Sequence, residues 1–486
     1  MKTSIARFVR GHSFAILCVI YLLSRLINLT KLPIFNDEAI YLDWGWKSLH
    51  TSAGLFYSLY DAKPPFLIWI FGVFESIIYS PLLMGRLVSV LAGLFALIGI
   101  YKIAKSLENE RVALLSSVYY IVIPLFTFFD RQALMESAIT ATGVWGFYFL
   151  LQILETKKDK YLIYLGLTLG IGIFIKLQAL VFLVSIILIL IYKKRLRAAA
   201  LSFITSLVIL SPLLLQKAFW ASFGSNNRFM LSISEILDFP FSLWIKNLST
   251  TIGVSFYLLT PLIFISVIAG ISLLFKRKKL LPAVYFITNI AIIIFLGRSL
   301  GTRYVTSFLA LTPIFASLAI LSFKKPVSLL IACITSVPAI MLTVLLIFSP
   351  LVYFNILDKM TALSQKTGYV SDWTSGYGIP ETINHLENVS QGKQITVGVR
   401  IDAGNPESAM FTYFNNSKNI IITYIDPRII NPELLKLPCL PSNVPVYFVA
   451  RDGILNGLDK FFQEDVRFGK PEGKHYISIH SLKKCN

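Results

Sequence analysis

Two apolar runs flank a short basic link in QALVFLVSIILILIYKKRLRAAALSFITSLVILSPLLL, residues 178–215. Each run approaches the length of a helix that crosses a lipid bilayer, about 20 residues. The link at residues 193–197 carries four Lys or Arg side chains, and such clusters mark the cytoplasmic side of membrane helices. This stretch therefore predicts two membrane helices joined on the cytoplasmic side.

The composition of the whole chain fits the same class. Of its 486 residues, 55% are hydrophobic and 15% are charged, and the mean hydropathy is +0.69. Soluble proteins are much less apolar, so we predict a polytopic α-helical membrane protein. A net charge of +19 would also suit a nucleic-acid-binding protein. The basic residues, however, punctuate apolar segments and form no polar face, which argues against nucleic acid as a partner.

About eleven apolar segments are predicted to be membrane helices. They cover residues 14–30, 83–104, 112–128, 136–154, 161–175, 178–192, 198–215, 250–275, 280–297, 304–322 and 327–349. The links rich in Lys and Arg fall on one side of this arrangement, which the positive-inside rule places in the cytoplasm. The N-terminus is then cytoplasmic. The long loops 31–82 and 216–249, and everything after residue 350, are predicted to lie on the outer face of the cytoplasmic membrane.

The apolar segment KPPFLIWIFGVFESIIYS, residues 63–80, is not counted among these spans. Counting it would move three basic links to the outer side, which the charge rule disfavours. We predict instead a helix that lies on the outer membrane surface.

The composition changes after Pro350. The strand-like runs ITVGVR, NIIITYID and VPVYFVA alternate with helical stretches at 378–389 and 406–415. This pattern predicts an outer α/β domain at 351–486, after a membrane domain at 1–350. Cys439 and Cys485 fall in the outer domain, but the sequence does not show that they meet to form a disulfide.

Charged residues gather in the predicted outer loops and at the outer ends of spans. The charged candidates are Asp37, Glu38, Asp61, Lys63, Arg86, Arg131, Glu136, Lys176, Arg298 and Arg303, and the neutral Tyr304 follows the last of them. For any one of them a simpler explanation exists: a solvated loop charge, a snorkelling lysine at 176, or a helix N-cap formed by Asn36 or Asp37. Together they place acids and cations at one membrane surface, where ionisable residues are functional candidates.

The order of these motifs resembles the GT-C glycosyltransferases. The order is NDE in the first outer loop, KPP before a surface helix, Arg86 at the start of a span, R-x-A-L-x-E at 131–136, a lysine between two short helices, and RY at the start of a late span. The chain is most similar to the dolichyl-phosphate-mannose protein mannosyltransferase-like group, which includes the lipid A aminoarabinose transferases. SDWTSGYGIPETINHL, residues 371–386, is similar to a segment that follows the last span in bacterial members.

The chain departs from the family pattern at three positions. The family often has Asp where Glu136 stands and Gly where Leu177 stands, and the aminoarabinose transferases have Glu where Ala62 stands. The last two departures leave the identity of the sugar and the role of Asp61 open.

The resemblance implies a sugar transfer from a polyprenyl-phosphate donor to a hydroxyl of a glycan, lipid or protein acceptor, with inversion. Such a reaction must stabilise charge on the leaving phosphate and remove one proton from the acceptor. Lys63, Lys176 and Arg303, with Tyr304, are the candidates for binding the phosphate.

Proton removal is assigned to a different residue, Asp37, as the general base. Glu38 and Glu136 are predicted to orient the base, the acceptor or a cation. Supporting roles are predicted for Asp61, Arg86, Arg131 and Arg298. The carboxylates could also bind a divalent cation, but no ligand spacing requires a metal.

Two other classes of function remain open at this stage. A solute transporter also suits eleven spans, but it should show internal repeats and ionisable residues at mid-membrane. No repeat is evident, and most of the charges lie at the edges of spans. A membrane scaffold that presents the outer domain to partners would leave the loop charges merely solvated.

Overall fold

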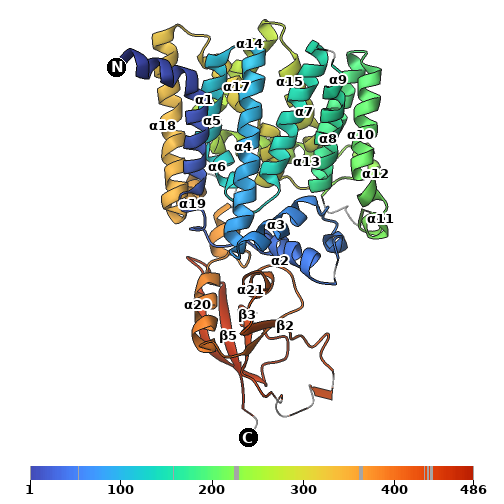
Figure 1. The fold of residues 1–486 in the computed structure, drawn as a ribbon, viewed down its shortest axis with the longest axis vertical. Coiled ribbons are helices and arrows are strands. Elements are labelled where there is room, and N and C mark those ends of the chain that lie inside the picture. The colour runs from blue at the N-terminus through green and yellow to red at the C-terminus, as the bar shows by residue number, and fades with distance from the viewer. Residues whose placement is uncertain are drawn as a thin grey trace. The chain divides into compact units, whose positions relative to one another are not determined.

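The computed structural model describes residues 2–52, 54–156, 158–223, 229–360, 365–431, 433–434, 437, 440 and 442–484 (Figure 1). These residues form two compact units, each built from separate stretches of the chain. The first unit comprises Met1–Asn28, Phe56–Leu67 and Arg86–Ser349. The second comprises Leu29–Leu55, Ile68–Gly85 and Pro350–Asn486. Most of the first outer loop therefore belongs to the same unit as the C-terminal stretch.

The first unit is a bundle of apolar helices (Figure 1). The helices near predicted spans are α1 (Lys2–Leu26), α4 (Pro81–Leu107), α5 (Glu110–Val122), α6 (Pro124–Asp130), α7 (Glu136–Thr156), α8 (Lys160–Ile175), α9 (Leu180–Tyr192), α10 (Leu196–Leu214), α13 (Phe241–Leu258), α14 (Pro261–Lys276), α15 (Leu281–Leu296), α16 (Thr302–Thr306), α17 (Thr312–Ile320) and α18 (Lys325–Phe348). The second outer loop contains the short helices α11 (Lys217–Phe223) and α12 (Ile233–Leu237).

The number of spans depends on how broken helices are counted. Among the described residues, four helices are long and apolar enough to cross a membrane, or seven if each of three bent pairs is one span. Further apolar helices, such as α8 and α15, are shorter than that criterion. The polytopic helical class is confirmed, and the count of eleven stays a prediction.

Prolines account for the broken helices. The axes of α5 and α6 differ by 65°, and those of α13 and α14 differ by 115°. Pro124 and Pro261 begin the second helix of each pair, because proline suits the first turn of a helix and disrupts a helix interior. The prediction of one continuous helix at 250–275 is wrong, since the chain turns at Thr260, whose φ is 73°.

The second unit contains the predicted α/β domain. Its strands are β1 (Ile395–Val399), β2 (Ile420–Tyr424), β3 (Val446–Arg451), β4 (Phe462–Gly469) and β5 (Tyr476–Leu482), and its helices include α19 (Pro350–Met360), α20 (Ile379–Ser390) and α21 (Glu407–Phe414). The sheet order is β2-β1-β3-β5-β4. β1 pairs in parallel with β2 and β3, while β5 is antiparallel to β3 and β4.

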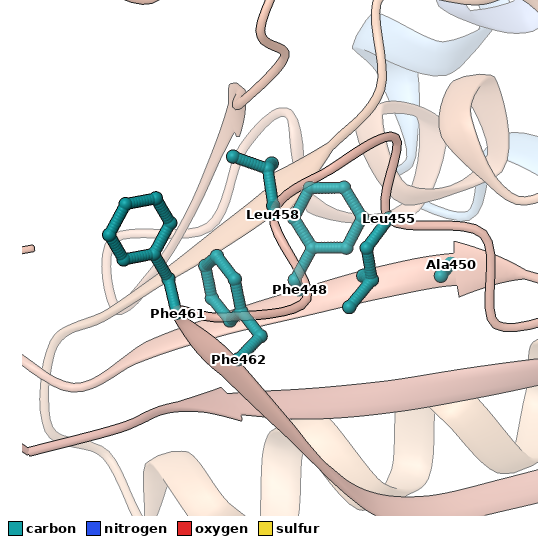
Figure 2. Close-up of a cluster of buried hydrophobic side chains, with 6 residues drawn as sticks. All are labelled: Phe448, Ala450, Leu455, Leu458, Phe461 and Phe462. Atoms are coloured by element: carbon teal, nitrogen blue, oxygen red, sulfur yellow. The ribbon is translucent and has the colours of Figure 1, made fainter. Parts of the chain in front are cut away.

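One face of β3 contributes to the core of this domain. Phe448 and Ala450 are two positions apart in the strand, so their side chains point to the same face. They pack with four buried side chains from the following loop and the start of β4 (Figure 2). These are Leu455, Leu458, Phe461 and Phe462. This packing fixes the sheet that carries the loops described below.

The first outer loop supplies two helices, α2 (Asn36–His50) and α3 (Phe66–Ile77). A Cβ on Gly72 of α3 would lie 2.3 Å from the carbonyl oxygen of Gly45 in α2, so two glycines permit this close approach. In turn, α2 contacts α21, where the Thr412 hydroxyl donates to the carbonyl of Ala39 at 3.0 Å. At 12 residues α3 is too short to cross a bilayer, which agrees with the surface helix predicted at 63–80.

A pH effect on stability follows from Asp426, which comes just after β2. Its buried carboxylate accepts hydrogen bonds from the N–H groups of Ile401 and Arg428 and from the Arg428 guanidinium. The Arg428 bonds hold the pKa of Asp426 well below its usual value. An acid whose pKa is lowered by folding stabilises the fold above its unfolded-state pKa, about 3.9, and loses that contribution as the pH falls further.

We therefore expect the melting temperature to drop as the pH falls below about 4. Asp426→Asn should lower the melting temperature at pH 7 and flatten this acid dependence, as measured by thermal unfolding in detergent between pH 3 and 7. The exposed Asp465, which accepts one bond from Ser481, provides the control Asp465→Asn. Equal acid slopes in the two variants would contradict the assignment.

Candidate functional site

Glu136, in the first turn of α7, accepts hydrogen bonds from two cations of the first unit. Its Oε1 lies 3.0 Å from Nζ of Lys176 and 3.1 Å from Nε of Arg303. The Glu136 side chain is 1% exposed, whereas those of Lys176 and Arg303 are 19% and 23% exposed. We call these three residues the cation cluster. Its carboxylate is buried, and both cations keep some access to the surface of their unit.

Each member of the cation cluster lies where a helix begins or breaks. Lys176 follows α8 with extended backbone angles and precedes the 3₁₀ turn η2 (Leu177–Ala179), so the predicted break is confirmed. Arg303 lies in the five-residue helix α16. Glu136 is an acid in a first helical turn, where the helix dipole favours negative charge. Irregular backbone near a membrane requires surrounding protein or water, which suits a site for a polar ligand.

Tyr304 and Lys63 extend the cation cluster. Nζ of Lys176 lies 5.0 Å from the centre of the Tyr304 ring, within cation–π range. Nζ of Lys63 lies 5.3 Å from the Phe229 ring, whose centre is 6.0 Å from that of Tyr304. The charge of Lys63 is also close enough to repel that of Lys176. The structure thus brings together all four residues that we predicted to bind phosphate.

The predicted acids Asp37 and Glu38 lie in the other compact unit, in the first turn of α2. Glu38 is fully buried, and its Oε2 accepts the backbone N–H of Phe35 at 2.9 Å. Asp37 is partly exposed, and its Oδ1 accepts from Nδ2 of Asn36 at 3.2 Å. The N-cap position belongs to Phe35 and not to Asn36 or Asp37, because Asn36 is already the first helical residue.

Arg131, predicted as a supporting cation, binds the end of α1. Its guanidinium donates to the backbone carbonyls of Ser24, Arg25, Ile27 and Asn28 at 2.6–3.1 Å. Basic side chains commonly satisfy the last carbonyls of a helix in this way. Because its donors face carbonyls of the fold, these contacts account for Arg131 without a ligand.

The other supporting candidates have different surroundings. Arg298 donates to both carboxylate oxygens of Glu235 in α12 at 2.7 Å, which links the second outer loop to the end of α15. Asp61 is about half exposed and lies 4.0 Å from Lys63. Arg86 is fully buried in α4. Asp61 thus lies beside Lys63, one of the predicted phosphate-binding residues.

The sequence reasoning missed a buried ion pair beside Arg131. Arg25, in the last turn of α1, is fully buried and donates from Nε and Nη2 to Asp130 at 3.3 Å. Asp130 also accepts from the hydroxyl of Ser137 at 2.8 Å. The one available signal was an arginine inside the apolar run 14–30, which requires a partner within the bundle.

A metal centre is not found in the part of the chain that the structure describes. No three His, Cys, Asp or Glu side chains there gather closely enough to hold a metal ion. Cys439 and Cys485, with the disulfide considered for them, lie outside the described residues.

Residues 62–220 match the family described as dolichyl-phosphate-mannose-protein mannosyltransferase, which covers a third of the chain. No curated protein matches the chain significantly.

Solved structures match over nearly the whole length. ArnT from Cupriavidus metallidurans bound to undecaprenyl phosphate has a TM-score of 0.59 at 14% identity, covering 96% of this chain and 97% of that chain. Its apo state gives a TM-score of 0.58 at 15% identity, covering 99% and 98%. An oligosaccharyltransferase from Archaeoglobus fulgidus, in complex with Zn and sulfate, gives 0.50 at 12% identity, covering 95% of this chain and 73% of that chain.

These matches confirm the fold that the motif order predicted from the sequence: the chain has the GT-C fold of ArnT, and residues 62–220 match the mannosyltransferase family model.

Proposed function

We propose that the protein transfers a sugar from a polyprenyl-phosphate donor to an acceptor hydroxyl on the outer face of the cytoplasmic membrane. The observation that carries this proposal is the cation cluster, in which Lys176 and Arg303 share one buried carboxylate and remain partly exposed. With Lys63 nearby, positive charge exceeds negative charge there, and such a site favours a phosphate group. The binding of undecaprenyl phosphate by ArnT supports the same ligand class.

The proposed roles follow from the chemistry of each group. Arg303 offers a planar fork to phosphate oxygens, and Lys63 and Lys176 act as point charges. Glu136 orients the two cations that it contacts. The acceptor oxygen attacks the anomeric carbon on the face opposite the phosphate, and the bond from that carbon to the phosphate oxygen breaks with inversion. Asp37 takes the acceptor proton, and polyprenyl phosphate leaves with the bonding electrons.

The experiment that tests this function uses purified protein and radiolabelled polyprenyl-phosphate sugars, supplied in turn with glycan, lipid and protein acceptors. We expect one donor to release polyprenyl phosphate in step with labelling of an acceptor. Sugar uptake into sealed vesicles without cleavage of any donor would instead favour a transporter. The sugar and the acceptor are read directly from the pair that reacts.

The orientation in the membrane is a separate prediction. Reporter fusions after residues 108, 195 and 278 should report the cytoplasm, because each lies in or beside a link rich in Lys and Arg. A fusion after residue 400 should report the exterior. A cytoplasmic signal at residue 400 would contradict the proposed orientation.

A further inference from the structure

We propose that Asn36 and the loop at 404–405 are positioning residues that hold the Asp37 carboxylate in its working orientation. The outer α/β domain would then take part in the reaction by orienting a catalytic group. This inference rests on the proposed role of Asp37 as general base. All of its contacts lie within the second compact unit.

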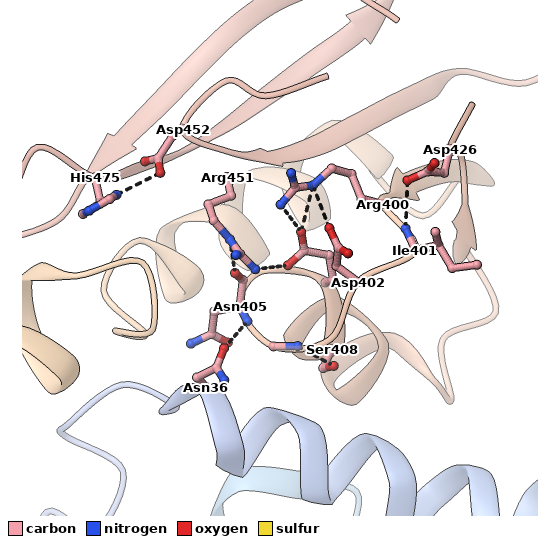
Figure 3. A network of polar contacts seen from close by, with 12 residues as sticks. Asn36, Arg400, Ile401, Asp402, Asn405, Ser408, Asp426, Arg451, Asp452 and His475 are labelled. Atoms are coloured by element: carbon pink, nitrogen blue, oxygen red, sulfur yellow. Dashed lines mark hydrogen bonds and ion pairs between the residues drawn. The ribbon is translucent and has the colours of Figure 1, made fainter. Parts of the chain in front are cut away.

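The orientation of the Asn36 amide is fixed by a backbone donor. The N–H of Asn405 lies 3.0 Å from Oδ1 of Asn36 (Figure 3). A backbone N–H can only donate, so the amide oxygen must face Asn405 and the amide NH₂ must face the other way. That NH₂ lies 3.2 Å from Oδ1 of Asp37. Because Asn36 is only 7% exposed, water does not readily replace either bond.

Asn405 is itself held on several sides. Its Nδ2 donates to the carbonyls of Ile34 and Thr374 at 3.1 Å each. Its own carbonyl accepts from Nε of Arg451 at 3.0 Å. The Thr374 carbonyl also accepts the backbone N–H of Asn36 at 3.0 Å, so both asparagines bind the same point of the segment 371–386.

A buried charge network fixes Arg451. Glu407, at the start of α21, accepts from Arg451 at 2.9 Å and from Arg400 at 2.9 and 3.1 Å. The Arg451 guanidinium also stacks 3.9 Å from the centre of the Trp373 ring. Bonds between charged groups in a buried setting are short and strong. The donor to the Asn405 carbonyl is therefore rigidly placed.

Gly404 shows how closely this loop approaches α2. Its φ is +109°, a conformation that other residues rarely adopt, and an added Cβ would lie 2.0 Å from Oδ1 of Asn36. A side chain at position 404 would thus displace the amide that faces Asp37.

The first test separates positioning from folding. Asn36→Asp keeps an acceptor for the Asn405 N–H but replaces the donor to Asp37 with a second carboxylate, which repels that of Asp37. We expect kcat for transfer to fall by about 10–100-fold, the range expected for losing a hydrogen bond to a charged group. The donor KM should stay near that of the wild type, whereas the melting temperature should fall somewhat because a second carboxylate is buried. Asn36→Ala should lower kcat as well, and Gly404→Ala should do so by displacing Asn36. Asn416→Ala, at an exposed position, is the control.

A double-mutant cycle tests whether Asn36 acts through Asp37. Asn36→Ala should cause no further loss of kcat when it is added to Asp37→Asn, because coupled residues are not additive. The inference would be overturned if Asn36→Ala and Asp37→Asn reduced kcat independently of each other. It would also be overturned if the Asn36 variants changed the melting temperature but kept the wild-type kcat. Full transfer by Asp37→Asn would instead overturn the base assignment and this inference with it. If Asp37→Asn is inactive while the Asn36 variants remain fully active, the inference about Asn36 is overturned but the assignment of Asp37 as the base stands.

Discussion

Asp37→Asn is expected to reduce sugar transfer by about 10²–10⁴-fold, the usual contribution of a positioned general base. The substitution preserves size and removes basicity. Donor binding should survive, because the proposal assigns the phosphate to Lys63, Lys176 and Arg303. The measurements are donor affinity, turnover and melting temperature on the same preparation.

The position of Asp37 in α2 makes this variant a clean test. The backbone N–H of the N-cap residue, Phe35, is bound by Glu38, so changing Asp37 leaves that contact in place. Asp465→Asn, at an exposed position of β4, controls for the loss of one negative charge. A folded Asp37→Asn protein that binds donor and transfers at more than about a tenth of the wild-type rate would refute the assignment. Glu38 and Glu136 would then be the next candidates.

Much of the fold could be predicted because it depends on local patterns. Apolar runs of helical length, punctuated by Lys and Arg, anticipated α4, α7, α10 and α18 within a few residues. The alternation of strand-like and helical runs after Pro350 anticipated β1, β2 and β3 with their helices. The sharp turn at Thr260 was missed, although Pro261 was visible in the sequence, because a long apolar run outweighed one proline.

The site could be predicted less completely because its contacts are non-local. The sequence proposed Glu136, Lys176 and Arg303 as charges at one surface, but not that one carboxylate binds cations 40 and 167 positions away. The contact between Asn36 and Asn405 spans 369 positions. Nor could it show that Arg131 caps α1, since an arginine at the end of a span fits a ligand equally well. Pairings of this kind depend on tertiary packing, which no local pattern encodes.

Arg303→Ala and Lys176→Ala should each weaken donor binding or turnover by about 10–100-fold, the effect of losing one hydrogen bond to a charged group. An exposed ion pair contributes only about 0–1 kcal/mol, so a mere surface charge would give a much smaller effect. Lys63→Ala should act in the same direction. Arg303→Lys should restore only part of the activity, because a lysine lacks the planar fork. Near-wild-type activity in all three alanine variants would remove these cations from the site.

These single changes carry a structural consequence that the experiment must separate from ligand binding. Removing one partner of a buried ion pair can cost about 3–5 kcal/mol of stability, because the other charge stays buried. The same holds for another single change, Lys176→Met, which leaves Glu136 with one cation fewer. A loss of activity in this variant then has two explanations, misfolding and loss of a phosphate contact. The double variant Lys176→Met with Glu136→Gln removes both the cation and the charge that it neutralises, and it should recover much of the lost stability.

The double variant then decides between two roles for Lys176. If the lysine serves only to neutralise Glu136, restored folding should bring back donor affinity and turnover. If the lysine binds the donor phosphate, the double variant should fold like the wild type and still bind donor about 10–100-fold more weakly. Thermal unfolding and titration with a polyprenyl-phosphate sugar, carried out on both variants, distinguish these outcomes. Wild-type donor affinity in the double variant would assign Lys176 to the stability of the bundle and leave Arg303 and Lys63 as the phosphate-binding residues.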